Sequence, residues 1–130
     1  MKETRDLSRE LAGVLKKYQG DTHRILKDHV RLDYLYALSG QRESLMDWYP
    51  FRADGVLLEA GAGYGALTGV YSRKVSRVHV LDPDEDNLEL NRLRHVELGG
   101  RTNISYETGE LCSYAASCDE KYDYVVFAGT

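Results

Sequence analysis

Hydrophobic positions in the first fifty residues recur at the three- and four-residue spacing of helices. One such run ends at Gly20, and Asp21 then predicts the N-cap of a second helix that continues to Gly40. A short third helix is expected over 42–48, before a proline. The apolar stripes of the first two helices consist of Leu7, Leu11, Val14, Leu15 and Tyr18, and of Ile25, Leu32, Leu35 and Tyr36. We interpret residues 1–50 as a helical cap that packs on the rest of the chain.

From residue 51 onward, short apolar runs alternate with segments of helical pattern. The runs predict four strands, at 56–58, 78–81, 103–107 and 122–128. A helix is expected between the first two strands, and a second one starts at Pro83, a residue suited to the first helical position. This alternation favours a parallel sheet with helices on its faces, and the usual doubly wound order arranges the strands 3-2-1-4. The sequence therefore predicts an α/β, Rossmann-like fold over 51–130 that stops after its fourth strand, with the C-terminal half absent.

The main chemical signal is the segment EAGAGYG at 59–65, which follows the first predicted strand and opens a helix. Glycines at alternate positions permit positive φ angles and let the backbone approach a ligand closely. An acid, Asp82, ends the second predicted strand, where its side chain can accept hydrogen bonds from both hydroxyls of a ribose. The strand, turn, helix and acid together predict a binding site for a nucleoside cofactor.

More than one function is compatible with this turn. Gly61, Gly63 and Ala66 satisfy the dinucleotide pattern G-x-G-x-x-G/A, so a fragment of an NAD(P)-dependent oxidoreductase is one alternative. However, the third glycine is Gly65, and Glu59 stands two residues before the first glycine. A carboxylate there would repel a pyrophosphate and would suit a ligand that carries an ammonium and a sulfonium group. A non-catalytic module that binds a nucleoside cofactor or oligomerises is a further alternative.

The order acid-x-G-x-G-x-G in VLLEAGAGYGALTG resembles the first motif of class I S-adenosylmethionine-dependent methyltransferases. The segments LSGQRESLMDWYPF, RTNISYETGEL and KYDYVVFAG are similar to bacterial methyltransferases associated with surface-polysaccharide glycosyltransferases. The resemblance covers about residues 38–129. It implies transfer of a methyl group from S-adenosyl-L-methionine to an unidentified small-molecule or saccharide acceptor. Because the acceptor pocket of this family comes mostly from later strands, we expect the 130-residue chain alone to be inactive.

The resemblance also implies roles for the residues of the glycine turn. The three glycines would line the methionine moiety, and Glu59 would lie near its amino group. Tyr64 lies inside the turn, which could place its ring over the ligand. The cofactor-binding residues expected here are Glu59, Gly61, Ala62, Gly63, Tyr64 and Gly65.

Later residues are implied for the nucleoside end of the cofactor and for the next loop. Asp82 would hold the ribose hydroxyls, and Pro83 would border the adenine. Glu110 would accept from the adenine amino group, and Leu111 would pack against the ring. Gly129 begins the loop after the fourth strand, which in this family contacts the methionine end.

The composition of the chain limits the kinds of partner, location and metal site that can be expected. With 17 basic and 21 acidic side chains, the chain has a net charge of −4, which argues against nucleic acid as its main partner. No apolar leader or stretch of membrane-spanning length is present, so a cytoplasmic location is expected. Cys112 and Cys118 lack the further ligands of a zinc site, and the four histidines have no metal-ligand spacing. We expect reduced thiols and no metal.

The fourth predicted strand, YVVFA, is apolar, and nothing after Thr130 would cover its outer edge. An exposed apolar edge strand is a template for pairing with another chain. We therefore expect self-association, most simply as a two-fold dimer that buries residues 125–127.

Overall fold

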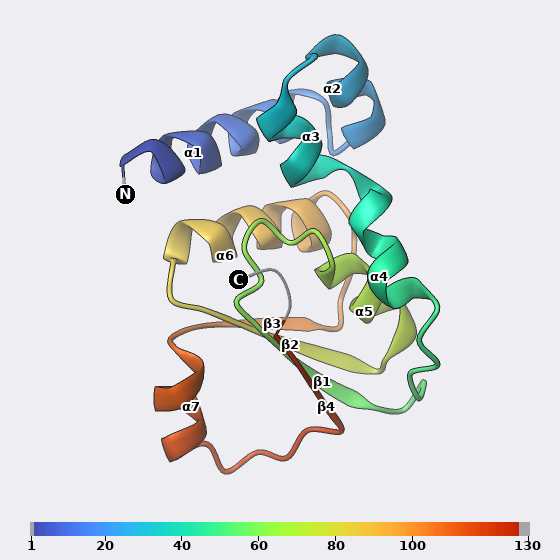
Figure 1. Cartoon of the computed structure of the whole chain (residues 1–130), viewed down its shortest axis with the longest axis vertical. Helices are drawn as coiled ribbons and strands as arrows, with labels where there is room; N and C mark the ends of the chain where they lie inside the picture. The colour runs from blue at the N-terminus through green and yellow to red at the C-terminus, as the bar shows by residue number, and fades with distance from the viewer. Residues whose placement is uncertain (1, 128–130) are drawn as a thin grey trace.

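The computed structural model describes the backbone of residues 2–127 and the side chains of residues 7–127, and this part of the chain contains one parallel sheet of four strands. The strands are β1 (Val56–Ala60), β2 (Arg77–Asp82), β3 (Ile104–Thr108) and β4 (Tyr124–Val126) (Figure 1). Their order is β3-β2-β1-β4, which confirms the predicted Rossmann-like arrangement. In the register, Leu58 of β1 lies between His79 of β2 and Val125 of β4. Because all four strands are parallel, their carboxyl ends meet at one edge of the sheet.

Helices lie on both faces of this sheet (Figure 1). One face carries α5 (Thr68–Lys74) and α6 (Glu85–Arg92), and α6 continues into a wider π-helical turn, η2 (Leu93–Glu97). The other face carries α7 (Leu111–Ser117), which the sequence did not predict. The sheet core consists of Leu57, Leu67, Tyr71, Val75, Val78, Val80 and Leu88.

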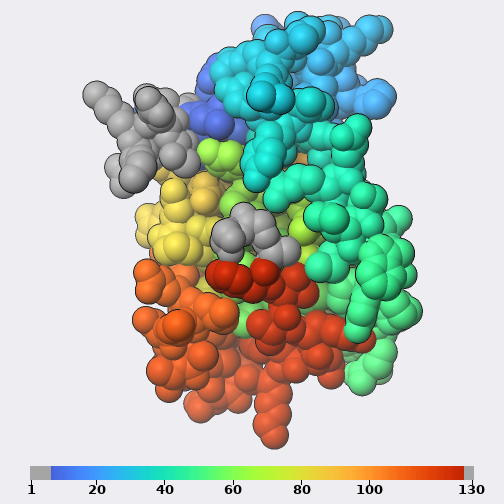
Figure 2. Space-filling model, viewed as in Figure 1, coloured from blue at the N-terminus to red at the C-terminus, as the bar shows by residue number. Residues whose placement is uncertain are grey.

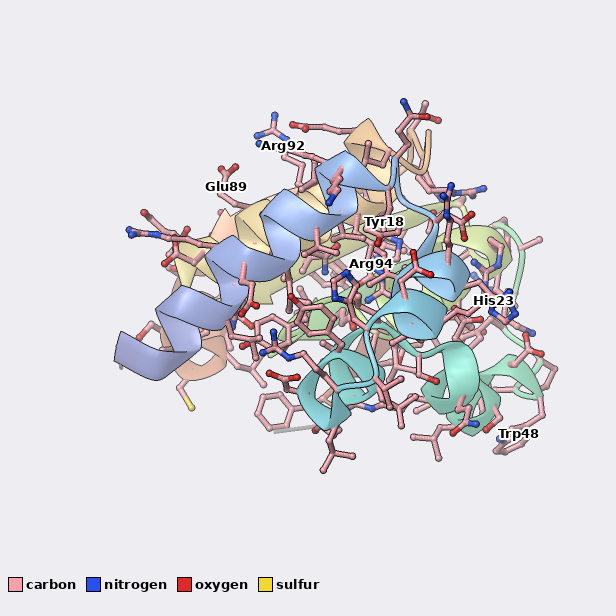
Figure 3. All side chains as sticks on the ribbon, turned by 90° about the horizontal axis from the view of Figure 1, so that it is seen from above. Tyr18, His23, Trp48, Glu89, Arg92 and Arg94 are labelled. Atoms are coloured by element: carbon pink, nitrogen blue, oxygen red, sulfur yellow. The ribbon has the colours of Figure 1, made fainter. Side chains whose placement is uncertain are left out.

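The N-terminal cap begins with α1 (Lys2–Lys17), which lies along α6 in Figures 1 and 3. Its buried side chains form a second core together with two residues of the α6–η2 helix. The members of this core are Leu11, Leu15, Ile25, Tyr34, Ala37, Leu38, Leu90 and Leu93. The cap is therefore fixed to the same helix that packs on the sheet.

The predicted second helix is wrong in its extent, because the chain forms two helices there, α2 (Thr22–Asp28) and α3 (Leu32–Leu38). Asp21 is the N-cap of α2, as expected, and accepts from the backbone N–H of Arg24 at 3.1 Å. Extended backbone at His29 and Arg31 separates the two helices and resets the helical phase. In consequence the predicted stripe residues Leu32, Leu35 and Tyr36 are exposed, and Tyr34, Ala37 and Leu38 are buried in their place.

Three smaller expectations also needed correction. The third helix is a 3₁₀ turn, η1 (Gly40–Glu43), followed by the single turn α4 (Ser44–Asp47). Pro83 precedes the N-cap of α6 instead of occupying its first position, because the side chain of Asp84 caps the helix at the N–H of Asp86. The strand β4 spans three residues, fewer than its apolar run suggested.

None of the helices within residues 2–127 combines the length and apolar character needed to cross a membrane.

Candidate cofactor site

The turn after β1 has the backbone that only glycine adopts freely. Gly61, Gly63 and Gly65 have φ angles of 68°, 59° and 82°, all in the left-handed region. A Cβ added at Gly63 would meet no atom within 4 Å, whereas one at Gly65 would lie 2.9 Å from the amide group of Asn91 and 3.2 Å from His95. Gly63 therefore faces open space, and Gly65 packs against the α6–η2 helix. Only after this turn does α5 begin, at Thr68.

A cavity of about 210 Å³ lies over the turn. Its lining from the Rossmann-like part includes Glu59, Gly61, Ala62, Gly63, Tyr64 and Asn87. The cap supplies Tyr36, Ala37 and Arg42. The interpretation of the cap as a packing element alone was therefore incomplete, since it forms one wall of the candidate site.

Asp82 fastens the turn to the end of β2. Its carboxylate is almost fully buried and accepts from the backbone N–H of Gly63 at 3.0 Å and of Asp84 at 2.9 Å. Each carboxylate oxygen has two lone pairs, so Asp82 keeps acceptor capacity for a ligand hydroxyl. The acid expected to hold a ribose also sets the position of the backbone that would approach the ligand.

The residues expected at the adenine end lie along the same edge of the sheet. Pro83 follows Asp82 directly, and Glu110 precedes α7 as its N-cap residue. The N–H of Gly109 donates to the carbonyl of Asp82 at 3.0 Å, which joins the ends of β2 and β3. Of the expected site residues, five lie outside the lining of the cavity: Gly65, Asp82, Pro83, Glu110 and Leu111. Gly129 lies outside the described residues.

Glu59 is buried at the base of the site and belongs to a chain of hydrogen bonds. The hydroxyl of Thr68 donates to its Oε1 at 2.5 Å. Thr68 in turn accepts from the amide of Asn91 at 2.8 Å, and Asn91 accepts from the hydroxyl of Tyr106 at 2.9 Å. Each link joins two different elements, so the network connects β1, α5, α6 and β3.

The charge state of Glu59 differs from the carboxylate assumed in the sequence argument. Loss of hydration on burial, helped by the nearby charge of Asp82, raises the pKa of the Glu59 carboxyl to about 8. The hydrogen bond from Thr68 opposes this shift but is the smaller effect. Glu59 is therefore mostly a neutral acid at pH 7 in this structure.

Two neighbouring residues of η2 hold the turn from behind. His95 donates from Nε2 to the carbonyl of Gly65 at 2.7 Å, and burial lowers its pKa to about 4, so the ring is neutral. Arg94 is turned inward, beneath the cap, whereas Glu89 and Arg92 of the same helix point outward (Figure 3). The buried guanidinium joins the cap to the turn by donating to the carbonyls of Ala37 (3.0 Å), Leu38 (3.2 Å) and Tyr64 (3.4 Å).

These supporting residues were missed by sequence reasoning. Thr68, Asn91, Arg94 and His95 meet partners 9 to 57 positions away in the chain, and no local motif contains them. Among the described side chains of residues 7–127, no three of the His, Cys, Asp or Glu type are grouped so that they could hold a metal ion.

Comparison with known proteins gives a fold but no sequence family. No family model and no curated protein matches the sequence. Solved structures do match. Phosphoethanolamine N-methyltransferase 1 from Haemonchus contortus, solved with phosphoethanolamine and S-adenosylhomocysteine, aligns with a TM-score of 0.58 and 20% identity, covering 95% of this chain and 25% of that one.

Two other structures each align with about two thirds of the chain. A putative methyltransferase from Bacillus halodurans has a TM-score of 0.56 and 21% identity over 68% of this chain and 38% of its own. Precorrin 8W decarboxylase from Methanobacterium thermoautotrophicum has a TM-score of 0.58 and 18% identity. The alignment covers 66% of this chain and 46% of the decarboxylase. The chain has the Rossmann-like fold found in methyltransferases. It spans between a quarter and a half of the length of these three structures.

Proposed function

We propose that the chain binds S-adenosyl-L-methionine and is the cofactor-binding part of a class I methyltransferase. The observation that carries this proposal is the glycine turn: Gly63 and the buried acid Glu59 line a cavity, and the acid Asp82 holds the backbone N–H of Gly63. The fold likeness to methyltransferases supports it, and one of those structures contains S-adenosylhomocysteine. A small-molecule or saccharide acceptor, a link to surface polysaccharides and a cytoplasmic location, all suggested by the sequence, belong to the same proposal.

When bound, the cofactor supplies an electrophilic methyl group on its sulfonium. The chain's own residues position it and exclude water. Gly61 and Gly63 let the backbone approach the methionine moiety, and Asp82 accepts from the ribose hydroxyls. Tyr64 and the cap residues that line the cavity shield this moiety from solvent. Pro83, Glu110 and Leu111 are proposed to contact the adenine from the adjoining strand ends.

The oxidoreductase alternative requires a pyrophosphate at the same turn. The proton on Glu59 removes the charge repulsion that argued against this ligand. The fold likeness favours the methyltransferase instead, because the matching structures include methyltransferases and one of them contains S-adenosylhomocysteine.

Calorimetric titration of the 130-residue chain with S-adenosylhomocysteine and with NAD⁺ tests the proposed function. We expect saturable binding of S-adenosylhomocysteine and no heat beyond dilution with NAD⁺. Binding of NAD⁺ alone would favour the oxidoreductase. Binding of neither ligand would contradict the proposed cofactor site and leave the non-catalytic, oligomerising module.

We also propose that the chain self-associates through β4, which pairs only with β1 among the described strands. Val125 and Phe127 are 58% and 60% exposed, beside Leu45 and Trp48 of the segment around α4. Trp48 projects from the body of the molecule in Figure 3, and β4 (red) lies on the visible face of Figure 2 next to the green residues of this segment. Their apolar side chains line a hollow of about 620 Å³. An unpaired apolar edge of this kind favours pairing with a second copy.

Light scattering coupled to size exclusion tests this association. We expect a dimer that Val125→Lys converts to monomer, because a charge on the edge strand opposes pairing. Val30→Lys is the matched control, since Val30 is 95% exposed on the cap, away from β4. A monomer at high concentration, or equal effects of the two variants, would contradict association through β4.

A further inference from the structure

The cavity over the glycine turn has walls of opposite chemistry. On the side of the sheet it is lined by the buried acid Glu59 and by Asn87, whose side-chain oxygen is buried without a hydrogen-bond partner in the described part of the chain. On the side of the cap it is lined by Arg42 and Tyr36. The guanidinium carbon of Arg42 lies 4.6 Å from the centroid of the Tyr36 ring. Among the side chains that the structure describes, those of residues 7–127, no carboxylate forms an ion pair with Arg42.

A buried acceptor without a donor costs stability unless a ligand supplies the donor. A guanidinium without a carboxylate partner is the group best suited to bind one through two parallel hydrogen bonds. An α-amino acid carries both complements on one carbon atom: an ammonium for the acceptors and a carboxylate for the arginine. The amino-acid end of S-adenosylmethionine fits this pair of walls.

We propose that Arg42 binds the carboxylate of the cofactor's amino-acid moiety, while Glu59 and Asn87 receive its ammonium. This inference rests on the proposed function and extends the site to the N-terminal cap. The cap then acts as a recognition element: it selects ligands that carry a free carboxylate as well as a nucleoside.

The structure gives Arg42 a defined position for this role. It lies in η1, whose N-cap Ser39 accepts from the N–H of Gln41 at 3.2 Å. Just before this turn, Arg94 ties the carbonyls of Ala37 and Leu38 to that of Tyr64 in the glycine turn. The Tyr36 ring supports the guanidinium from one face, which holds the side chain near the cavity and leaves its N–H edges available.

The experiment compares two ligands that differ in one group. The first is S-adenosylhomocysteine, and the second is its decarboxylated analogue, which keeps the nucleoside, the thioether and the amine. We expect Arg42→Ala to weaken binding of S-adenosylhomocysteine by about tenfold, the usual scale for a lost charge-assisted hydrogen bond. The same variant should bind the decarboxylated analogue as the unchanged protein does, within about twofold. Arg42→Lys should show an intermediate loss, because it keeps the charge without the paired N–H groups.

Arg24→Ala is the matched control. Arg24 is also a cap arginine stacked over a tyrosine, with its guanidinium carbon 5.8 Å from the Tyr18 ring, but it lines a different hollow. We expect it to bind both ligands normally. Unchanged binding of S-adenosylhomocysteine by Arg42→Ala, or equal losses for both ligands, would overturn the role of Arg42. If the unchanged protein bound neither ligand, the proposed function itself would fail, so the two failures are distinguishable.

Discussion

Replacing Gly63 with valine is expected to abolish binding of S-adenosylhomocysteine while the chain stays folded. At a φ of 59° a β-branched residue is strained, at a cost of about 1–2 kcal/mol. A Cβ at this position would meet no protein atom within 4 Å, so the added side chain enters the space where the backbone should approach the ligand. Calorimetry measures the loss of binding, and circular dichroism reports whether the fold is kept.

Gly100→Val is the control that separates two effects of a valine: blocking the contact between the backbone and the ligand, and straining the backbone. Gly100 has a φ of 72°, and a Cβ there would also meet nothing within 4 Å, but the residue precedes β3 and lies at the amino ends of the strands. It therefore carries the same strain without facing the cavity, and we expect normal binding. If Gly63→Val bound as tightly as the unchanged chain, the turn would be structural only. If Gly100→Val lost binding to the same degree, strain alone would explain the effect.

The order of the strands could be predicted because its causes are general. Short apolar runs alternate with helical patterns along the chain, and connections between parallel strands are right-handed. The glycine turn could also be predicted, since its requirement for positive φ at Gly61, Gly63 and Gly65 is local. Asp82 was found from its distance to the turn, although its two bonds to backbone N–H groups were not foreseen.

The helices of the cap were harder to predict because long-range contacts decide where they break. Arg31 forms ion pairs with Asp33 and with Glu10, which lies 21 positions earlier in α1. The extended backbone at this point shifts the buried face of α3 from Leu35 to Tyr34 and Leu38. A prediction that treats the segment as one continuous helix assumes a single buried face, so it cannot show this change of face. Similarly, α7 has no buried residue and so no apolar stripe to indicate it.

The electrostatics of the site could not be deduced from residue types. The sequence places an acid at position 59, but the depth of burial sets its charge, and Thr68, Asn91 and Tyr106 come from three other elements. The cap wall was missed for a related reason. Tyr36 and Arg42 belong to the cavity only because the α1–α3 region packs on α6 and places them beside the turn.

Glu59→Gln is expected to make the protein more stable at pH 8 and to change little at pH 4.5. The pKa of Glu59 is about 8 in the folded chain, against about 4.5 for the same carboxyl when exposed. Between these pH values the unfolded chain loses this proton while the folded chain retains it. The folded state then binds more protons, so the free energy of unfolding falls as pH rises, by on the order of 4 kcal/mol over the whole interval.

Glutamine removes this dependence and preserves the contacts. Its side-chain oxygen can still accept from Thr68, and its amide, like the protonated acid, supplies a donor. Urea unfolding at pH 4.5, 6 and 8 should give similar stabilities for the two proteins at the lowest pH. At pH 8 the free energy of unfolding of the variant should exceed that of the unchanged protein by on the order of 4 kcal/mol.

Glu89→Gln is the control for this titration, because Glu89 lies exposed on the outer side of α6 and points away from the core (Figure 3). This control makes the same chemical change, from a carboxyl to an amide, without touching a buried group. We expect its stability to follow that of the unchanged protein at every pH. Parallel curves for Glu59→Gln and the unchanged protein would mean that Glu59 ionises normally in the folded chain. In that case Glu59 would be a charged carboxylate at neutral pH. Its charge would then repel a pyrophosphate, as expected from the sequence.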